Sequence, residues 1–221
     1  NGAALTTRWA YYNDQNDPGS YRKVKSKEMP NGERVTHQYN TNGYESCEVH
    51  SWKDTPFDSP AANARAIHYE YAPLVAGDSS LFNDQRPRIV TEKILGIPVA
   101  RTYHAYVTNA VRQLQEIEER CSSPTASYGD ASNLRTTRTY FGTNVANHLI
   151  GRLKTIEFPD GTLDTYTYEY GTLPASWTNP AIVQFTPDTD AQSSRETITH
   201  RTTNSPDGPA GSPSIRDERR P

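Results

Sequence analysis

The chain has 221 residues, of which 33% are hydrophobic, and its 23 basic and 26 acidic side chains leave a net charge of −3. Charges of both signs are interspersed, so no basic stripe indicates nucleic acid, and no apolar run is long enough to span a bilayer. Tyrosine is frequent, with 14 copies against a single methionine. Aromatic rings with a polar end suit thin, half-exposed sheets, so the composition favours an all-β chain.

Residues 1–52 are predicted to form a strand followed by a three-stranded meander. Leu5 to Tyr12 alternates weakly and ends in a dense cluster of turn-forming residues. Tyr21 to Trp52 contains two short connectors, Pro30-Asn31-Gly32 and Asn40-Thr41-Asn42-Gly43, between alternating segments. We therefore expect a first hairpin meander in this part of the chain.

Residues 53–133 are predicted to hold strands separated by long loops. Strands are expected over 65–71, 88–95 and 99–107, with a turn at Gly96-Ile97-Pro98. Loops are expected over 53–63, 77–87 and 122–133, and the middle one is expected to be mobile. Leu114 to Cys121 combines helical spacing of its apolar residues with a position between strands. Strand is the favoured interpretation there, and helix remains the alternative.

Residues 134–171 are predicted to contain a strand over 134–141, a linker over 142–150 and then a second hairpin over 151–171. Its two arms are joined by Pro159-Asp160-Gly161. Proline fixes φ, aspartate caps its own backbone, and glycine accepts a positive φ, which together are typical of a tight turn. On the second arm Tyr166, Tyr168 and Tyr170 recur at every second position, so their side chains are expected on one face.

Residues 172–221 are predicted to contain further strands. A loop to residue 180 is followed by short strands over 181–185 and 195–203, and a return strand begins at Ile215. A return strand that is cut off shortly after it begins favours an internal piece of a longer polypeptide, and a natural disordered tail rich in proline, glycine and charge is the open alternative.

The two hairpins are copies of one pattern. Aligning Gly32 on Gly161, a shift of 129 positions, superimposes the two turns. The same shift places Tyr39 on Tyr168, Val24 on Leu153 and Glu28 on Glu157. Turns and aromatic return strands therefore coincide, which indicates a repeat unit.

This pattern resembles a known repeat. The run from Gly151-Arg152-Leu153 through Pro159-Asp160-Gly161 to Tyr166 and Tyr168 resembles the YD repeat of the RHS-repeat proteins. That family includes bacterial Rhs polymorphic toxins, insecticidal toxin-complex shell components and teneurins. The earlier copy, from Pro30-Asn31-Gly32 to Tyr39, is similar, with Asn40 in the place of the aspartate that names the repeat.

The resemblance implies an architecture of antiparallel hairpins that associate into a strip of sheet, which spirals into a hollow shell. It implies a structural segment of a secreted or cell-surface bacterial protein. Its partners would be neighbouring repeats and an enclosed C-terminal toxin cargo domain. Because a hairpin cannot bury its face alone, stacking of neighbours is also the physical expectation.

No enzymatic chemistry is predicted. The six histidines lie on separate predicted elements without metal-ligand spacing, and no glycine-rich phosphate loop or nucleophile elbow occurs. We therefore assign no catalytic, cofactor-binding or metal-binding residue. Cys47 and Cys121 could form a disulfide or remain separate thiols, and the sequence leaves both alternatives open.

A binding role is the alternative to a structural one. Rows of tyrosine, together with Trp9, Trp52 and Trp177, could form aromatic platforms on which sugars stack. The alternative function is therefore an extracellular adhesive or carbohydrate-binding β-module. Cross-strand aromatic packing explains the same tyrosines without a ligand and is favoured.

Overall fold

The computed structural model describes residues 6–52, 60–78, 85–172, 186–187, 193–201 and 214–219. Within these residues the chain is all-β, with antiparallel strands, one 3-10 turn and no α-helix. The elements are β1 (Arg8–Tyr11), β2 (Val24–Glu28), β3 (Arg34–Tyr39), β4 (Glu45–Ser51), η1 (Ala61–Asn63), β5 (Arg65–Glu70), β6 (Ile89–Ile94), β7 (Ile97–Thr108), β8 (Leu114–Arg120), β9 (Leu134–Tyr140), β10 (Leu153–Glu157), β11 (Leu163–Thr172), β12 (Thr186–Pro187), β13 (Ser193–Arg201) and β14 (Ser214–Arg219). The short strand expected over 181–185, and residues 53–59 and 79–84 of the expected loops, lie outside the described residues.

The strands form one open sheet in which chain order is nearly sheet order. Each strand from β1 to β11 is hydrogen-bonded to the next, β13 and β14 follow, and β12 pairs with β11. The segment from Leu114 is the strand β8, so the helical alternative is wrong: sheet pairing overrides the helical spacing of its apolar residues. The chain divides into two compact units, one of residues 1–105 and 118–134, the other of residues 106–117 and 135–221.

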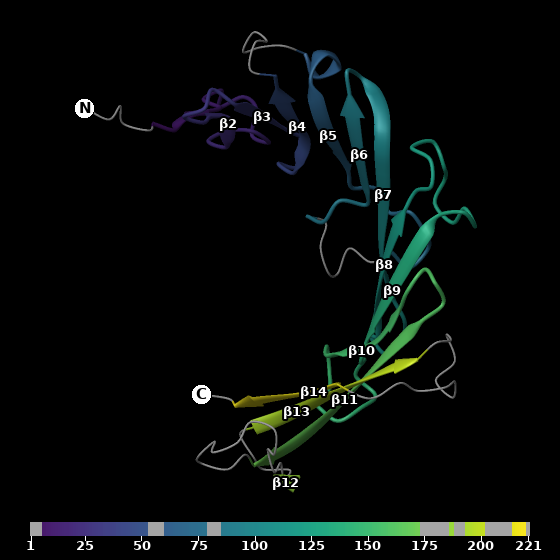
Figure 1. The fold of residues 1–221 in the computed structure, drawn as a ribbon. Coiled ribbons are helices and arrows are strands. Elements are labelled where there is room, and N and C mark those ends of the chain that lie inside the picture. Colours follow the sequence, from purple (N-terminus) through teal and green to yellow (C-terminus); the bar gives the residue numbers. More distant parts are fainter. Residues whose placement is uncertain are drawn as a thin grey trace. The chain divides into compact units, whose positions relative to one another are not determined.

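In the first unit the predicted meander of β2, β3 and β4 is confirmed. β2 and β3 pair antiparallel, with Ser26 opposite Thr36, and β3 pairs with β4 in the same way. Figure 1 shows β2, β3 and β4 in this order. The turn between β2 and β3 contains Gly32 at a φ of +83°, a conformation that glycine adopts without strain. The next strands, β5 and β6, continue the same antiparallel pairing.

The turn between β6 and β7 differs from the prediction. The expected turn at Gly96-Ile97-Pro98 is wrong, because the turn residues are Leu95 and Gly96, with φ of +52° and +81°. Ile94 pairs directly with Ile97, which makes a two-residue hairpin. Pro98 therefore lies inside β7, opposite Lys93, where the register shifts. A bulge of this kind accommodates a proline, which has no amide hydrogen to give to the ladder.

The buried core of the first unit is small. One cluster consists of Cys47, Val49, Ala64 and Ala66, with Ala61 packed against them, and Val35, Tyr103 and Ala105 are buried elsewhere among the described residues of the unit. The side chains of the cluster are short, so the apolar area that the cluster removes from water is limited. Hydrogen bonds and aromatic contacts between neighbouring strands must therefore supply much of the stability.

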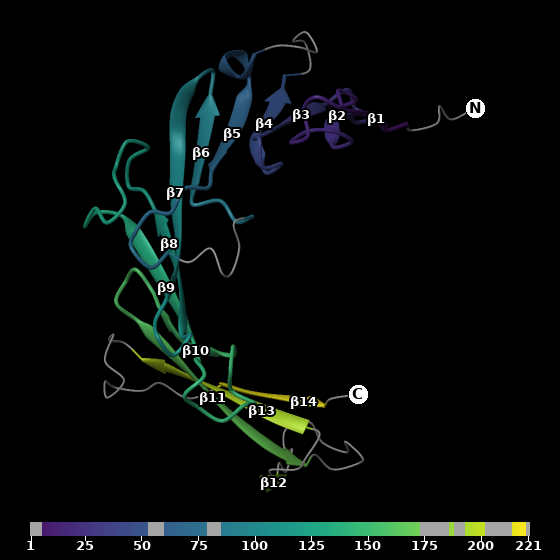
Figure 2. The same ribbon diagram turned by 180° about the vertical axis from the view of Figure 1, so that it is seen from behind.

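The second unit repeats the meander. β9, β10 and β11 are successive antiparallel partners, and β11 pairs with β13 from Leu163 to Gly171. β13 then pairs with β14, so the strand predicted near residue 195 and the return strand predicted at Ile215 are both confirmed. Figure 2 shows β11, β13 and β14 side by side.

Candidate functional site

The first hairpin is held at its open end by Tyr39, the last residue of β3. The hydroxyl of Tyr39 donates a hydrogen bond of 3.0 Å to the carbonyl oxygen of Val24, the first residue of β2. The ammonium nitrogen of Lys23 lies 4.8 Å from the centre of the Tyr39 ring. The ring of Tyr12 meets the same ring edge-on, with 6.1 Å between centroids. One tyrosine thus contacts a backbone acceptor, a cation and a second ring.

The second hairpin has the same set of contacts around Tyr168. Its hydroxyl donates a hydrogen bond of 2.9 Å to the carbonyl oxygen of Leu153, the first residue of β10. The guanidinium carbon of Arg152 lies 4.8 Å from the ring centre, and Phe141 meets the ring edge-on at 6.4 Å. Each of these residues lies 129 positions beyond its counterpart in the first hairpin. We call residues 12–39 the N-terminal copy and residues 141–168 the C-terminal copy.

The backbone of the two copies also agrees. In each copy, the residue whose ring meets the tyrosine edge-on also makes two backbone hydrogen bonds to the bend before the first strand of the hairpin. Tyr12 bonds in this way with Lys23 and Arg22, at 3.0 Å each. Phe141 bonds with Arg152 and Gly151, at 2.9 Å each. The bend residue has a positive φ in both, +63° at Arg22 and +76° at Gly151. Because a positive φ is costly for arginine, the bend is imposed by the surrounding contacts in the N-terminal copy.

The turns of the two copies match as well. The side-chain oxygen of Asn31 accepts the amide of Glu33 at 3.0 Å, and that of Asp160 accepts the amide of Thr162 at 3.0 Å. Gly161 has the same φ of +83° as its counterpart in the first turn. Hydrogen bonds from the hydroxyl and the amide of Thr162 lower the pKa of Asp160. Each hairpin is thus closed by a capped turn at one end and by a tyrosine at the other.

The residues selected from the sequence lie in these two hairpins. They are Pro30, Asn31, Gly32 and Tyr39 in the N-terminal copy, and Gly151, Arg152, Leu153, Pro159, Asp160, Gly161, Tyr166 and Tyr168 in or beside the C-terminal copy. Sequence reasoning missed the contacts of Lys23, Tyr12 and Phe141 with the two tyrosines. Extending the shift of 129 positions toward the N-terminus would have found them, because it aligns Lys23 with Arg152 and Tyr12 with Phe141.

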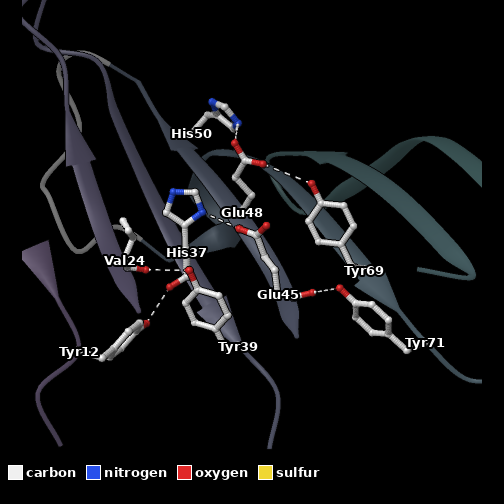
Figure 3. A network of polar contacts seen from close by, with 9 residues as sticks. All are labelled: Tyr12, Val24, His37, Tyr39, Glu45, Glu48, His50, Tyr69 and Tyr71. Atoms are coloured by element: carbon white, nitrogen blue, oxygen red, sulfur yellow. Dashed lines mark hydrogen bonds and ion pairs between the residues drawn. The ribbon is translucent and has the colours of Figure 1, made fainter. Parts of the chain in front are cut away.

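A polar network extends from the N-terminal copy across β3, β4 and β5 (Figure 3). Nδ1 of His37 lies 2.5 Å from Oε1 of Glu45. The carboxylate of Glu48 accepts the hydroxyl of Tyr69 at 3.3 Å, and its other oxygen lies 2.9 Å from Nε2 of His50. The hydroxyl of Tyr71 donates to the carbonyl oxygen of Glu45 at 2.7 Å. These contacts connect each strand to its neighbour.

The tyrosines of the network are held in their neutral form. Burial is the main cause that raises the pKa of Tyr69, followed by the charges of Glu48 and Glu45. Burial and then Glu45 raise the pKa of Tyr39 and Tyr71 in the same way. Near neutral pH these phenols act as hydrogen-bond donors. In this form they are poor bases and nucleophiles.

A hollow of about 400 Å³ lies beside this network. Its aromatic walls are Tyr44, Tyr69 and Tyr71, and the rings of Tyr44 and Tyr71 are 5.1 Å apart with a tilt of 40°. The remaining lining residues are Gly43, Glu45, Gln85 and Pro87. A volume of this size can accept a small ligand or a single side chain.

The two cysteines are free thiols. Cys47 is buried and its sulfur lies 4.0 Å from Nε2 of His68, whereas Cys121 donates to the carbonyl oxygen of Ala126 at 3.7 Å. Burial is the main cause that raises the pKa of both thiols, which makes them less reactive.

The described residues contain no group of three or more His, Cys, Asp or Glu side chains arranged to hold a metal ion. In the same residues no helix has the length and apolar character needed to cross a membrane. No protein-family model matches the chain, and no curated protein matches it either. The internal repeat is therefore the feature from which a function can be inferred.

Proposed function

We propose that the chain is a structural β-repeat segment of a secreted or cell-surface bacterial shell protein of the RHS type. Its hairpins would pack against neighbouring repeats of the same polypeptide or assembly. The strip so formed would enclose a C-terminal toxin cargo domain, and the segment itself would have no enzymatic activity. The observation that carries the proposal is the recurrence of the Tyr39 contacts around Tyr168, 129 positions later.

The physical argument concerns how a hairpin becomes a stackable unit. An isolated two-stranded hairpin is only marginally stable in water. Here each copy is fixed at both ends, and its two edges remain available to neighbours on either side. In the first hairpin β2 pairs outward with β1 and β3 with β4, and in the second β10 pairs outward with β9 and β11 with β13. Such a unit can be added repeatedly, because its stability is the sum of internal contacts and nearest-neighbour contacts.

Imaging the full-length polypeptide by electron microscopy tests this proposal. The expected result is a hollow shell whose wall is a continuous strip of hairpins, with residues 12–39 and 141–168 as equivalent units of the wall. A compact, closed sandwich without unpaired sheet edges would refute it. The full reading frame provides an independent check, because further copies of the pattern and a dissimilar C-terminal domain are expected in it.

The second candidate is an extracellular adhesive or carbohydrate-binding module. It is favoured by two exposed indole rings, since 50% of the surface of Trp9 and 48% of that of Trp52 is accessible. Exposed indole rings are suited to stacking against sugars, and one face of Trp9 is already covered by the ammonium of Lys27, 5.0 Å from the ring centre. A glycan array probed with the native chain and with the Trp9→Ala and Trp52→Ala variants tests it. Hits that both variants lose would support binding, and an array without hits would eliminate it.

A further inference from the structure

The turn between β6 and β7 presents a leucine to solvent in a strained conformation. Leu95 and Gly96 are the two turn residues, with φ of +52° and +81°, and hairpins of this kind favour asparagine or glycine at both positions. A positive φ is costly for leucine, and Leu95 also has an exposed fraction of 58%. Two unfavourable features at one residue indicate that this leucine contacts something outside the chain.

The residues around this leucine are apolar and exposed as well. Ile94, Ile97 and Val99 have exposed fractions of 37%, 67% and 43%. Ile94 and Ile97 are direct cross-strand partners, so their side chains lie on the same face of the hairpin. From residue 94 to residue 100 the sequence contains no charged side chain and none that can form a hydrogen bond. We call residues 94–99 the apolar tip.

Two cations flank the apolar tip, Lys93 on β6 and Arg101 on β7. Within the part of the chain that the structure describes, neither forms an ion pair, and Arg101 donates a hydrogen bond to the hydroxyl of Thr91 at 3.3 Å. The carboxylate of Glu92, on the same hairpin, is paired with Arg65, with 2.6 Å between Oε1 and Nε. The base of the tip therefore carries a positive charge that is not neutralised by a contact within the hairpin.

The tip projects beyond its neighbour and has the depth of a lipid headgroup layer. The amide of Cys121, the residue after β8, donates to the carbonyl of Arg101 at 3.0 Å, so residues 97–100 of β7 lie beyond the end of β8. Lys93 directly precedes Ile94, and Arg101 lies opposite Thr91, about 10 Å from Ile94 along the strand. Apolar side chains buried about 5–10 Å in a membrane interface would hold both cations at the level of the phosphates.

We propose that the apolar tip inserts into the surface of an anionic lipid membrane. Leu95 and the side chains beside it enter the boundary of the acyl chains, and Lys93 and Arg101 pair with lipid phosphates. Charge complementarity selects this occupant, because a convex apolar end with cations at its base matches a deformable apolar layer beneath negative headgroups. The inference goes beyond the proposed function and does not depend on it, since it rests on residues 91–101 and their contacts.

Co-sedimentation of the whole chain with lipid vesicles tests the partner. Binding is expected to mixed vesicles of phosphatidylcholine and phosphatidylglycerol, about tenfold weaker binding to phosphatidylcholine alone, and a loss of binding to the mixed vesicles as salt is added. No binding to the mixed vesicles, or equal binding to both kinds, would overturn the proposal. Sedimentation velocity without lipid tests the competing occupant, a second copy of the chain. A dimer that Leu95→Asn abolishes would assign the tip to that copy and overturn the proposal.

Variants locate the contact. Leu95→Asn gives the turn its favoured Asn-Gly sequence, so it is expected to weaken vesicle binding about tenfold while amide protection of β6 and β7 stays equal or rises. Ile97→Thr keeps a β-branched residue in the strand and is expected to weaken binding about fivefold to tenfold, and Lys93→Gln about fivefold. The matched control is Leu134→Asn on β9, because Leu134 is also 58% exposed but lies outside the tip, and native binding is expected. Native binding by Leu95→Asn, or reduced protection of β6 and β7 in it, would show that the leucine serves the fold and would refute the proposal.

Discussion

Replacing Tyr39 or Tyr168 by phenylalanine removes one oxygen and leaves the ring, the cation and the second ring in place. The hydrogen bonds lost to the carbonyls of Val24 and Leu153 are 3.0 Å and 2.9 Å long, and Tyr168 also loses its hydrogen bond to the side chain of Glu196. A hydrogen bond of this type contributes about 0.5–1.5 kcal/mol net, and a half-buried carbonyl is left without its partner. We therefore expect each substitution to destabilise its own hairpin by about 1 kcal/mol.

Substitution by leucine removes the ring as well and gives a larger effect. The edge-to-face contact contributes about 0.5–1.5 kcal/mol, and the cation above the ring about 0.5–1 kcal/mol more. With the hydroxyl included, Tyr39→Leu and Tyr168→Leu are each expected to cost about 1.5–4 kcal/mol. The cations of the two copies should contribute alike, because both lie 4.8 Å from the ring centre, whereas Tyr168→Leu also loses the hydrogen bond to Glu196.

Amide hydrogen exchange on the 221-residue chain is the appropriate assay, because it reports opening hairpin by hairpin. Tyr39→Phe is expected to reduce protection in β2 and β3 by about fivefold and to leave β10 and β11 unchanged. Tyr168→Phe should have the converse effect, since contacts in a linear array are mainly between neighbours. Unchanged protection in both variants, or a clear loss in only one, would refute the equivalence of the copies.

Three further predictions concern other contacts. The buried side chains of Arg88 and Asp78 form an ion pair at 2.9 Å. Asp78→Asn alone is expected to lower the free energy of unfolding, measured by chemical denaturation, by about 3–5 kcal/mol. The double change Asp78→Leu with Arg88→Met is expected to lower it much less, because no buried charge is left without a partner. The Cβ atom added by Gly32→Ala or Gly161→Ala would have no other atom within 4 Å, but alanine would have to adopt a φ of +83°. Each substitution is therefore expected to lower the free energy of unfolding by about 1–2 kcal/mol. Burial raises the pKa of six tyrosines in the folded chain: Tyr12, Tyr39, Tyr69, Tyr71, Tyr166 and Tyr168. Their contribution to stability is therefore fully present below the unfolded pKa of about 10, and it is lost as the pH rises through the folded pKa values. The unfolding midpoint measured against pH should therefore fall above pH 10, and a midpoint that stays constant there would contradict the assignment of neutral, buried phenols.

Local chemistry made most strands and the two matching turns predictable. Proline followed by Asn or Asp and then Gly specifies a tight turn by itself, whatever lies around it. Alternation then defines the arms, and β2, β3, β10 and β11 appear where these signals place them. The correspondence of the two hairpins was predictable for the same reason, because Gly32 and Gly161 both adopt a φ of +83° in the turn.

Tertiary contacts decided what the sequence could not. At the β6–β7 hairpin the amide of Leu95 donates to the carbonyl oxygen of Ala64 at 3.0 Å, which helps to hold a leucine at a positive φ. A proline after glycine suggested a later turn, but a register shift absorbs Pro98 inside the strand. Similarly, the spacing of Cys47 and Cys121 along the chain carries no information on whether their sulfurs meet.

The abundance of tyrosine, the first feature of the composition, has a structural cause. The buried cluster of Cys47, Val49 and alanines gains little from apolar burial. A tyrosine in the return strand adds a ring contact and a hydrogen bond to the first carbonyl of an earlier strand, and so fixes where that strand begins. The residue before that carbonyl then decides what covers the ring: a cation at Lys23 and Arg152, and a second ring at Tyr44.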